Sequence, residues 1–145
     1  MTGLDTNVLV RYLTQDDPVQ SAQVDQLIEQ TLSQGKSLFI NHIVLCELVW
    51  VLTRAYDYPK SDVVEVIEKI LLAIQFEIED KSSVWEALND FKTSRADFAD
   101  CLIGVKNRNA GCEKTWSFDK ATCVLDSFTS LETAHLLTSP KIKPE

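Results

Sequence analysis

Short apolar runs alternate along the chain with longer stretches in which apolar residues recur every three or four positions. The longer stretches, such as the one containing Val63, Ile67, Ile70 and Ile74, have the spacing of one helix face. The short runs are typical of strands. Taken in order, the pattern predicts β-α-α-β-α-α-β-α-α-β. The predicted strands lie at Thr2–Asp5, Ser37–Ile40, Phe76–Ile78 and Thr115–Phe118.

Polar caps, glycine and proline delimit the predicted helices. Asp16–Pro18 combines cap residues with a proline in the first helical turn, and Gly35 supplies a stop. Asn41 is placed to cap a helix over His42–Ala55, and a later helix is predicted over Ala96–Asn109. Strands alternating with helices predict an α/β fold with three layers, α/β/α, around a mostly parallel central sheet.

Length and apolar content are those of one domain with its own core. The chain has 145 residues, of which 45% are hydrophobic, and a domain of this size needs no metal or disulfide staple. We expect residues 1–130 to form the domain and residues 131–145 to be a frayed C-terminal extension. No apolar run reaches the length of a membrane span, and no targeting segment is visible, so we expect a cytoplasmic location without a membrane.

Charge and cysteine content narrow the function classes. The net charge is -8, from 22 acidic and 14 basic residues, which argues against a general nucleic-acid coat. An enzyme that holds nucleic acid through a local basic patch or bound metal ions stays open. The 4 cysteines lack zinc-site spacing, and we expect reduced thiols that fill core positions.

One carboxylate lies in an otherwise apolar helix. Glu47 is the one charged residue of Ile43–Leu52, and a helix that is apolar nearly all round is expected to be buried. A buried carboxylate is costly unless it is paired or binds a metal. A salt bridge to Arg11 or Arg54, or a Glu47 that reaches an edge of the helix, is the structural alternative.

Two further carboxylates follow predicted strands. Asp5 ends the first strand and Asp119 ends the last one. Ligands of open α/β sheets collect at the carboxyl ends of strands, although an aspartate there also serves as a helix cap, for Asp119 over Lys120–Leu125. A cap and a ligand role are compatible, because a carboxylate has lone pairs for both.

Asp97 and Asp100 share one face of the helix that begins near Ala96, because they are three positions apart. Acids in a first turn also suit the helix dipole, which is the structural alternative for Asp97. Asp100 is harder to explain in this way, since Cys101, Leu102 and Ile103 follow it.

Together these acids indicate a cation site. If Asp5, Glu47, Asp100 and Asp119 meet at one sheet edge, their repulsion opposes folding unless cations lie between them. Oxygen ligands without histidine or cysteine fit Mg²⁺ or Mn²⁺. Such ions activate water and stabilise a leaving oxygen, so hydrolysis of phosphodiesters is the natural chemistry.

The chain resembles the PIN-domain family, and within it the VapC-type toxin ribonucleases of toxin–antitoxin pairs. Each motif alone is common, whereas the set of four in this order is specific and extends to about residue 128. The matching segments are Leu4–Val10, Glu47–Leu52, Ala96–Ile103 and Ser117–Asp119.

The resemblance implies a metal-dependent endoribonuclease with Mg²⁺ or Mn²⁺ in an acidic pocket, where metal-activated water attacks the RNA phosphate. The catalytic and metal-binding acids would be Asp5, Glu47, Asp100 and Asp119, with Asp97 as an outer acid. Thr6 and Asn7 would orient water, metal or phosphate, and Ser117 stands where the family often has threonine. The basic residues expected to hold flanking phosphates are Arg95, Lys106, Arg108 and Lys120.

The family also implies a homodimer and a cognate VapB-type antitoxin. Two other functions stay open: a catalytically degenerate domain that binds RNA or protein, and an acidic interaction protein without metal. A phosphatase of the haloacid-dehalogenase type is disfavoured, because Asn7 stands where its second aspartate is typical.

Overall fold

The computed structural model describes residues 1–132, and the sheet ladders in it are all parallel. The predicted order of elements is confirmed, with one strand more than predicted. The helices are α1 (Thr6–Thr14), α2 (Pro18–Ser33), α3 (His42–Arg54), α4 (Lys60–Leu72), α5 (Lys81–Thr93) and α6 (Phe98–Asn109), with a 3-10 turn η1 (Thr122–Val124). The strands are β1 (Thr2–Gly3), β2 (Leu38–Ile40), β3 (Phe76–Ile78), β4 (Thr115–Ser117) and β5 (Phe128–Ser130).

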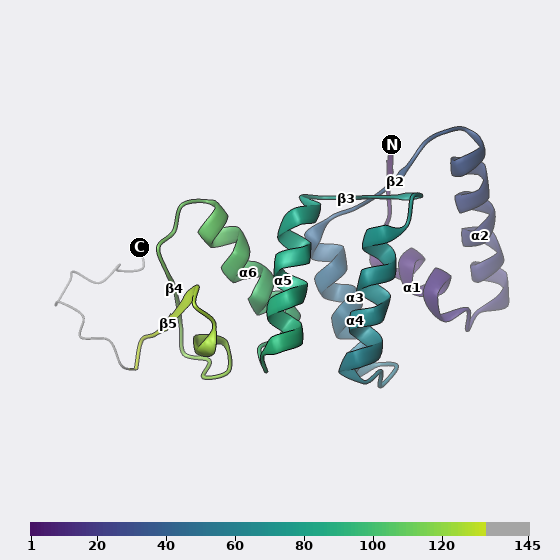
Figure 1. The fold of residues 1–145 in the computed structure, drawn as a ribbon. Helices are drawn as coiled ribbons and strands as arrows, with labels where there is room; N and C mark the ends of the chain where they lie inside the picture. Colours follow the sequence, from purple (N-terminus) through teal and green to yellow (C-terminus); the bar gives the residue numbers. More distant parts are fainter. Residues whose placement is uncertain (133–145) are drawn as a thin grey trace, which may run out of the picture.

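The strands form two parallel sheets. One has the order β1-β2-β3, and β4 pairs with β5 in a second sheet. Figure 1 shows the β4–β5 pair at the end of the molecule opposite α2. Six helices and parallel strands confirm the α/β class in residues 1–132. The pattern did not predict β5, because a three-residue strand with two hydroxyl side chains carries little β signal.

The core lies between α3 and the elements around it. Leu38 and Ile40 of β2 are fully buried, as are Leu45, Leu48 and Leu52, which recur along one face of α3. This spacing is the helical pattern that the sequence predicted. Since β1 and β2 run parallel, with Thr2 opposite Leu38, the chain leaves both strands at the same edge. The starts of α1 and α3 therefore lie side by side.

Gly104 allows the C-terminal segment to pack against α6. A Cβ at this position would lie 2.6 Å from Ser127 Oγ and closer still to the Phe128 ring. A larger residue at this position would therefore require the Phe128 ring and the Ser127 hydroxyl to move. Gly104 thus fixes where β5, and with it the turn after Asp119, lies on α6.

The expectations for the cysteines and for the C-terminal extension have different outcomes. All four cysteines are free thiols, but the expectation that they fill the core is right only for Cys101, because Cys112 is exposed. No helix within residues 1–132 is long and apolar enough to cross a bilayer. The predicted C-terminal extension lies largely outside the described residues, and the domain boundary at residue 130 stays a prediction.

Candidate functional site

Asp5 and Glu47 are joined through Thr6. Asp5 is the N-cap of α1, and its Oδ1 accepts a hydrogen bond of 2.8 Å from the Thr6 amide. The buried Thr6 hydroxyl donates to Glu47 Oε1 at 3.1 Å. Asp5 itself is exposed, so it caps the helix and keeps lone pairs for a ligand. The two acids thus lie on either side of one ordered side chain.

The helix around Glu47 is not buried on all sides as its composition predicts, and Glu47 reaches the surface, which is the structural alternative given for it. The faces of α3 with Val44, Leu45 and Leu48 pack into the core, whereas Glu47 is exposed. Its neighbours on that face, Ile43 and Trp50, are 70% and 64% exposed. Apolar composition was misleading because two of the apolar residues lie on the solvent face. The Glu47 carboxylate therefore carries no burial cost.

Asp100 lies in a second group of acids. It is half-buried in the first turn of α6, and Asp97 occupies the N-cap position without a capping side-chain bond. Burial raises the pKa of Asp100, and the charges of Asp97 and Asp119 raise this pKa further. The chain thus places three carboxylates within electrostatic range of one another.

Asp119 organises the turn that follows β4. Its Oδ1 accepts hydrogen bonds from the amides of Ala121 (2.9 Å) and Thr122 (3.1 Å), and the Ser117 hydroxyl accepts from the Asp119 amide at 3.0 Å. The predicted helix over Lys120–Leu125 is wrong, because only the 3-10 turn η1 forms there. Asp119 therefore holds a turn and does not cap a helix, and the N-cap of η1 is Ala121.

Thr122 is a site residue that the sequence analysis missed. Its hydroxyl lies close enough to Asp100 to lower the pKa of that carboxyl. The Oγ1 atom is nevertheless buried without a hydrogen bond of normal length in residues 1–132. A buried hydroxyl without a partner is costly, and here it faces carboxylates. The one feature of the sequence that could have indicated Thr122 is its position three residues after Asp119.

Cys46, which precedes Glu47 on α3, lies within electrostatic range of Asp100. Burial raises the pKa of the Cys46 thiol, and the Asp100 charge raises it further, so Asp100 lies near this part of α3. Within residues 1–132, however, no three acidic, histidine or cysteine side chains are close enough to hold one ion. The convergence of all four acids on a single ion stays a prediction.

The donor set is of the kind that hard divalent cations prefer. In the described part of the chain, none of Asp5, Glu47, Asp100 and Asp119 forms an ion pair with lysine or arginine. The side chains around them offer carboxylate and hydroxyl oxygens, as Mg²⁺ and Mn²⁺ require. The unpartnered Thr122 hydroxyl beside Asp100 fits a bound water or ion in the same place.

Lys106 is oriented by the buried His42. His42 Nε2 lies 2.7 Å from the Glu79 carbonyl oxygen, which can only accept, so Nε2 carries the proton. Nδ1 is then the acceptor for Lys106 Nζ at 3.0 Å. The Lys106 charge also lowers the pKa of Cys46, so the ammonium lies within electrostatic range of this thiol. Spacing along the chain gave no sign of this contact.

Among the residues that the structure describes, the other basic residues that were expected to hold flanking phosphates show no comparable contact with the buried His42. Arg108 Nη2 donates to Glu86 Oε2 at 2.7 Å, so its charge is already balanced by α5. Arg95 and Lys120 are exposed. Asn7 is exposed in the first turn of α1, next to Asp5 and Thr6.

Comparison with known proteins shows the family by sequence. The PIN domain model matches residues 4–127. The chain is 32% identical over 121 residues to a VapC ribonuclease of Aquifex aeolicus (strain VF5), an alignment that covers 83% of this chain and 88% of that protein. No solved structure gives a significant match.

Proposed function

Because the chain belongs to the PIN-domain family, we propose that it is a metal-dependent endoribonuclease of the VapC type, the toxin of a type II toxin–antitoxin pair. The hydrogen bond from Thr6 to Glu47 is the main structural support. It fixes Glu47 beside Asp5, although the bonded residues are 41 positions apart. Neither acid is neutralised by a cation of the described chain.

Each acid has a distinct role in this proposal. Asp5 and Asp100 provide the main contacts to Mg²⁺ or Mn²⁺, and Glu47 and Asp119 complete the shell directly or through water. When bound, the ion supplies an activated water and stabilises the leaving oxygen. Asp97 is an outer acid, and a carboxylate of the group takes the proton from the attacking water.

Hydroxyl groups and one lysine position the reacting groups. Thr6 holds Glu47, and Ser117 holds the turn that carries Asp119. Lys106, oriented by His42, contacts a phosphate of the RNA. Arg95 and Lys120 bind flanking phosphates, whereas the pairing of Arg108 with Glu86 leaves it a smaller part.

As a VapC-type toxin, the protein would bind an antitoxin and a second copy of itself. A cognate VapB-type antitoxin blocks the acids, and two copies of the chain form a homodimer in the cytoplasm. The exposed apolar residues Ile43 and Trp50 on α3, beside Glu47, offer a surface on which such a partner can bury area. Their exposure in a single chain supports an additional contact.

Cleavage of labelled RNA in Mn²⁺ tests the proposed function. Asp5→Asn and Asp100→Asn should each lower the rate at least about 100-fold, because each removes a charge from the site. Asparagine caps helices as well as aspartate does, so α1 stays intact in Asp5→Asn. Glu29→Gln changes an exposed acid of α2 and serves as the control.

A chelator should abolish cleavage by the wild-type protein, and excess Mn²⁺ should restore it. Full cleavage by Asp5→Asn, or cleavage in the chelator, would contradict the proposed mechanism. Tight RNA binding without cleavage under all conditions would instead support the catalytically degenerate alternative.

A further inference from the structure

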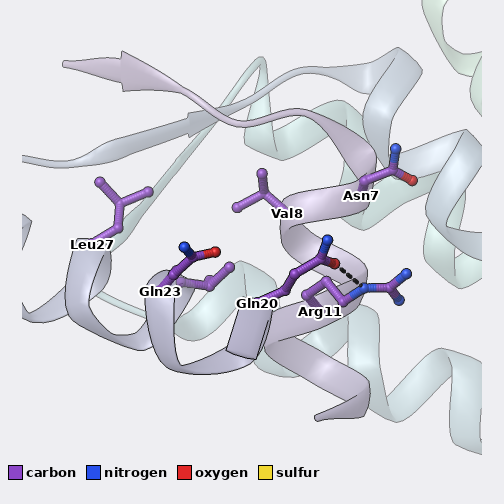
Figure 2. Close-up of a pocket in the computed structure, with 7 residues that line it drawn as sticks. Asn7, Val8, Arg11, Gln20, Gln23 and Leu27 are labelled. Atoms are coloured by element: carbon purple, nitrogen blue, oxygen red, sulfur yellow. Dashed lines mark hydrogen bonds between the residues drawn. The ribbon is translucent and has the colours of Figure 1, made fainter. Parts of the chain in front are cut away.

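A cavity of about 330 Å³ lies between α1 and α2. It starts at Asn7, which follows Asp5 and Thr6 in the first turn of α1 (Figure 2). Asn7 is two residues after Asp5, the N-cap of α1, so this end of the cavity borders the first turn of that helix. Its volume is at the lower end of the range for small-molecule sites, about 300–1,000 Å³.

The cavity combines an aliphatic wall with polar groups that have fixed positions. Val8, Val24 and Leu27 form the apolar part. Opposite them, Arg11 Nε donates to Gln20 Oε1 at 2.6 Å (Figure 2). The bond uses the Gln20 carbonyl oxygen, so the free end of this side chain is its NH₂ donor.

The Arg11 guanidinium is held rigidly. Its Nη1 donates to the Tyr56 hydroxyl at 3.3 Å and lies 3.4 Å from Asp16 Oδ1. Asp16 also balances its charge. A planar group held on two sides is arranged in advance to stack on another planar group. Its balanced charge makes it a poor binder of a free phosphate.

Two carboxamides are left without partners. Within residues 1–132, the side chains of Asn7 and Gln23 make no hydrogen bond, although both line the cavity. Each offers a donor and an acceptor on one planar group. Glutamine and asparagine carboxamides pair with the edges of nucleobases in this way.

We propose that this cavity binds one unpaired base of the RNA, next to the cleaved phosphate. The inference rests on the proposed ribonuclease function and adds a base-reading subsite to it. The base packs against Val8 and Val24, stacks on Arg11, and its edge is read by Gln20 and Gln23. Single-stranded bases are recognised by this combination of stacking and edge contacts. A helical peptide would need a longer apolar groove than three residues provide.

Cleavage of RNA oligonucleotides that differ at one base beside the mapped cleavage site tests the subsite. The wild type should discriminate among the four bases, and Gln23→Leu should reduce the ratio of kcat/KM between the best and worst base about tenfold. Gln26→Leu changes an exposed residue of the same helix that does not line the cavity, and should behave as the wild type.

A binding measurement without metal separates this inference from the nuclease function. The side-chain amide signals of Gln20 and Gln23 should shift in NMR spectra when adenosine, guanosine, cytidine or uridine is added. If these signals shift while the protein cleaves no RNA, the base site stands and the proposed function fails. If RNA is cleaved but Gln23→Leu keeps the base preference and no nucleoside moves the signals, the subsite is wrong. Signals that respond only to an antitoxin peptide would likewise overturn it.

Discussion

Thr6 joins the start of α1 to α3 through a single side-chain hydrogen bond. It lies between the two acids that it serves, since its amide binds Asp5 Oδ1 and its hydroxyl binds Glu47 Oε1. Such outer partners orient the groups that bind a metal. Thr6 can therefore orient Asp5 and Glu47 without contacting the ion itself.

Thr6→Val tests this positioning role. Valine keeps the shape of the side chain but cannot donate to Glu47, so Mn²⁺ affinity should fall by about 10- to 100-fold. Thr6→Ser restores the hydroxyl and should recover most of the affinity. Calorimetric titration of Mn²⁺ measures both variants. Equal affinities for Thr6→Val and the wild type would show that the bond to Glu47 is irrelevant to the site.

Helix α5 begins at Asp80, an N-cap with a left-handed backbone (φ 37°). The Ser83 hydroxyl donates to its Oδ2 at 2.6 Å, and this hydrogen bond lowers the pKa of Asp80 below the ordinary value of 3.8. A lowered folded-state pKa means that the charged cap stabilises the fold at higher pH. The contribution is fully present above pH 3.8 and is lost as the pH falls through the folded-state pKa.

Asp80→Asn isolates that charge, because asparagine tolerates the same backbone and still caps. The wild type should be more stable than Asp80→Asn at pH 7, and the difference should shrink as the pH falls below 3.8 and through the folded-state pKa of Asp80. Asp80→Ala should lose about 1 kcal/mol of unfolding free energy at pH 7. Chemical denaturation across this pH range provides the measurement. A constant difference between wild type and Asp80→Asn would refute the titration argument.

The C-terminal segment packs closely against Gly104 of α6. Alanine there gains about 1 kcal/mol in helix propensity but overlaps the Phe128 ring and Ser127 Oγ. Overpacking typically costs about 1–3 kcal/mol. Gly104→Ala should therefore destabilise the protein by about 1 kcal/mol, as measured by thermal unfolding.

Phe128→Leu shortens the ring that meets the new methyl group and provides the paired control. The penalty of Gly104→Ala should be smaller in the Phe128→Leu background than in the wild type. A Gly104→Ala protein more stable than the wild type would mean that helix propensity prevails and the close packing is unimportant.

Across the whole molecule, the sequence was most informative about elements and acids. β3 was predicted residue for residue, and the acids at strand ends were found because polar residues follow apolar runs. Three features were not predictable: the exposed face of α3 with Glu47, the pairing of β4 with β5, and the bond from Lys106 to His42. Each depends on contacts between distant segments, which local periodicity does not encode.

In the proposed function, acids from distant segments of the chain act together as one divalent-ion site. In the structure Thr6 links Asp5 to Glu47, Asp100 lies within electrostatic range of Asp119, and the Asp100 charge also reaches Cys46, the neighbour of Glu47 on α3. An ion shared by both groups would connect α1 and α3 with α6 and the turn after β4. Loss of either group should then remove the same binding event.

Calorimetric titration of Mn²⁺ into the wild type, Asp5→Asn, Asp100→Asn and the Glu29→Gln control tests this claim most directly. Mn²⁺ should bind the wild type and Glu29→Gln with the same affinity. Asp5→Asn and Asp100→Asn should each weaken Mn²⁺ binding at least about tenfold. Unchanged Mn²⁺ binding by Asp5→Asn, with loss only in Asp100→Asn, would contradict a site shared between the two groups.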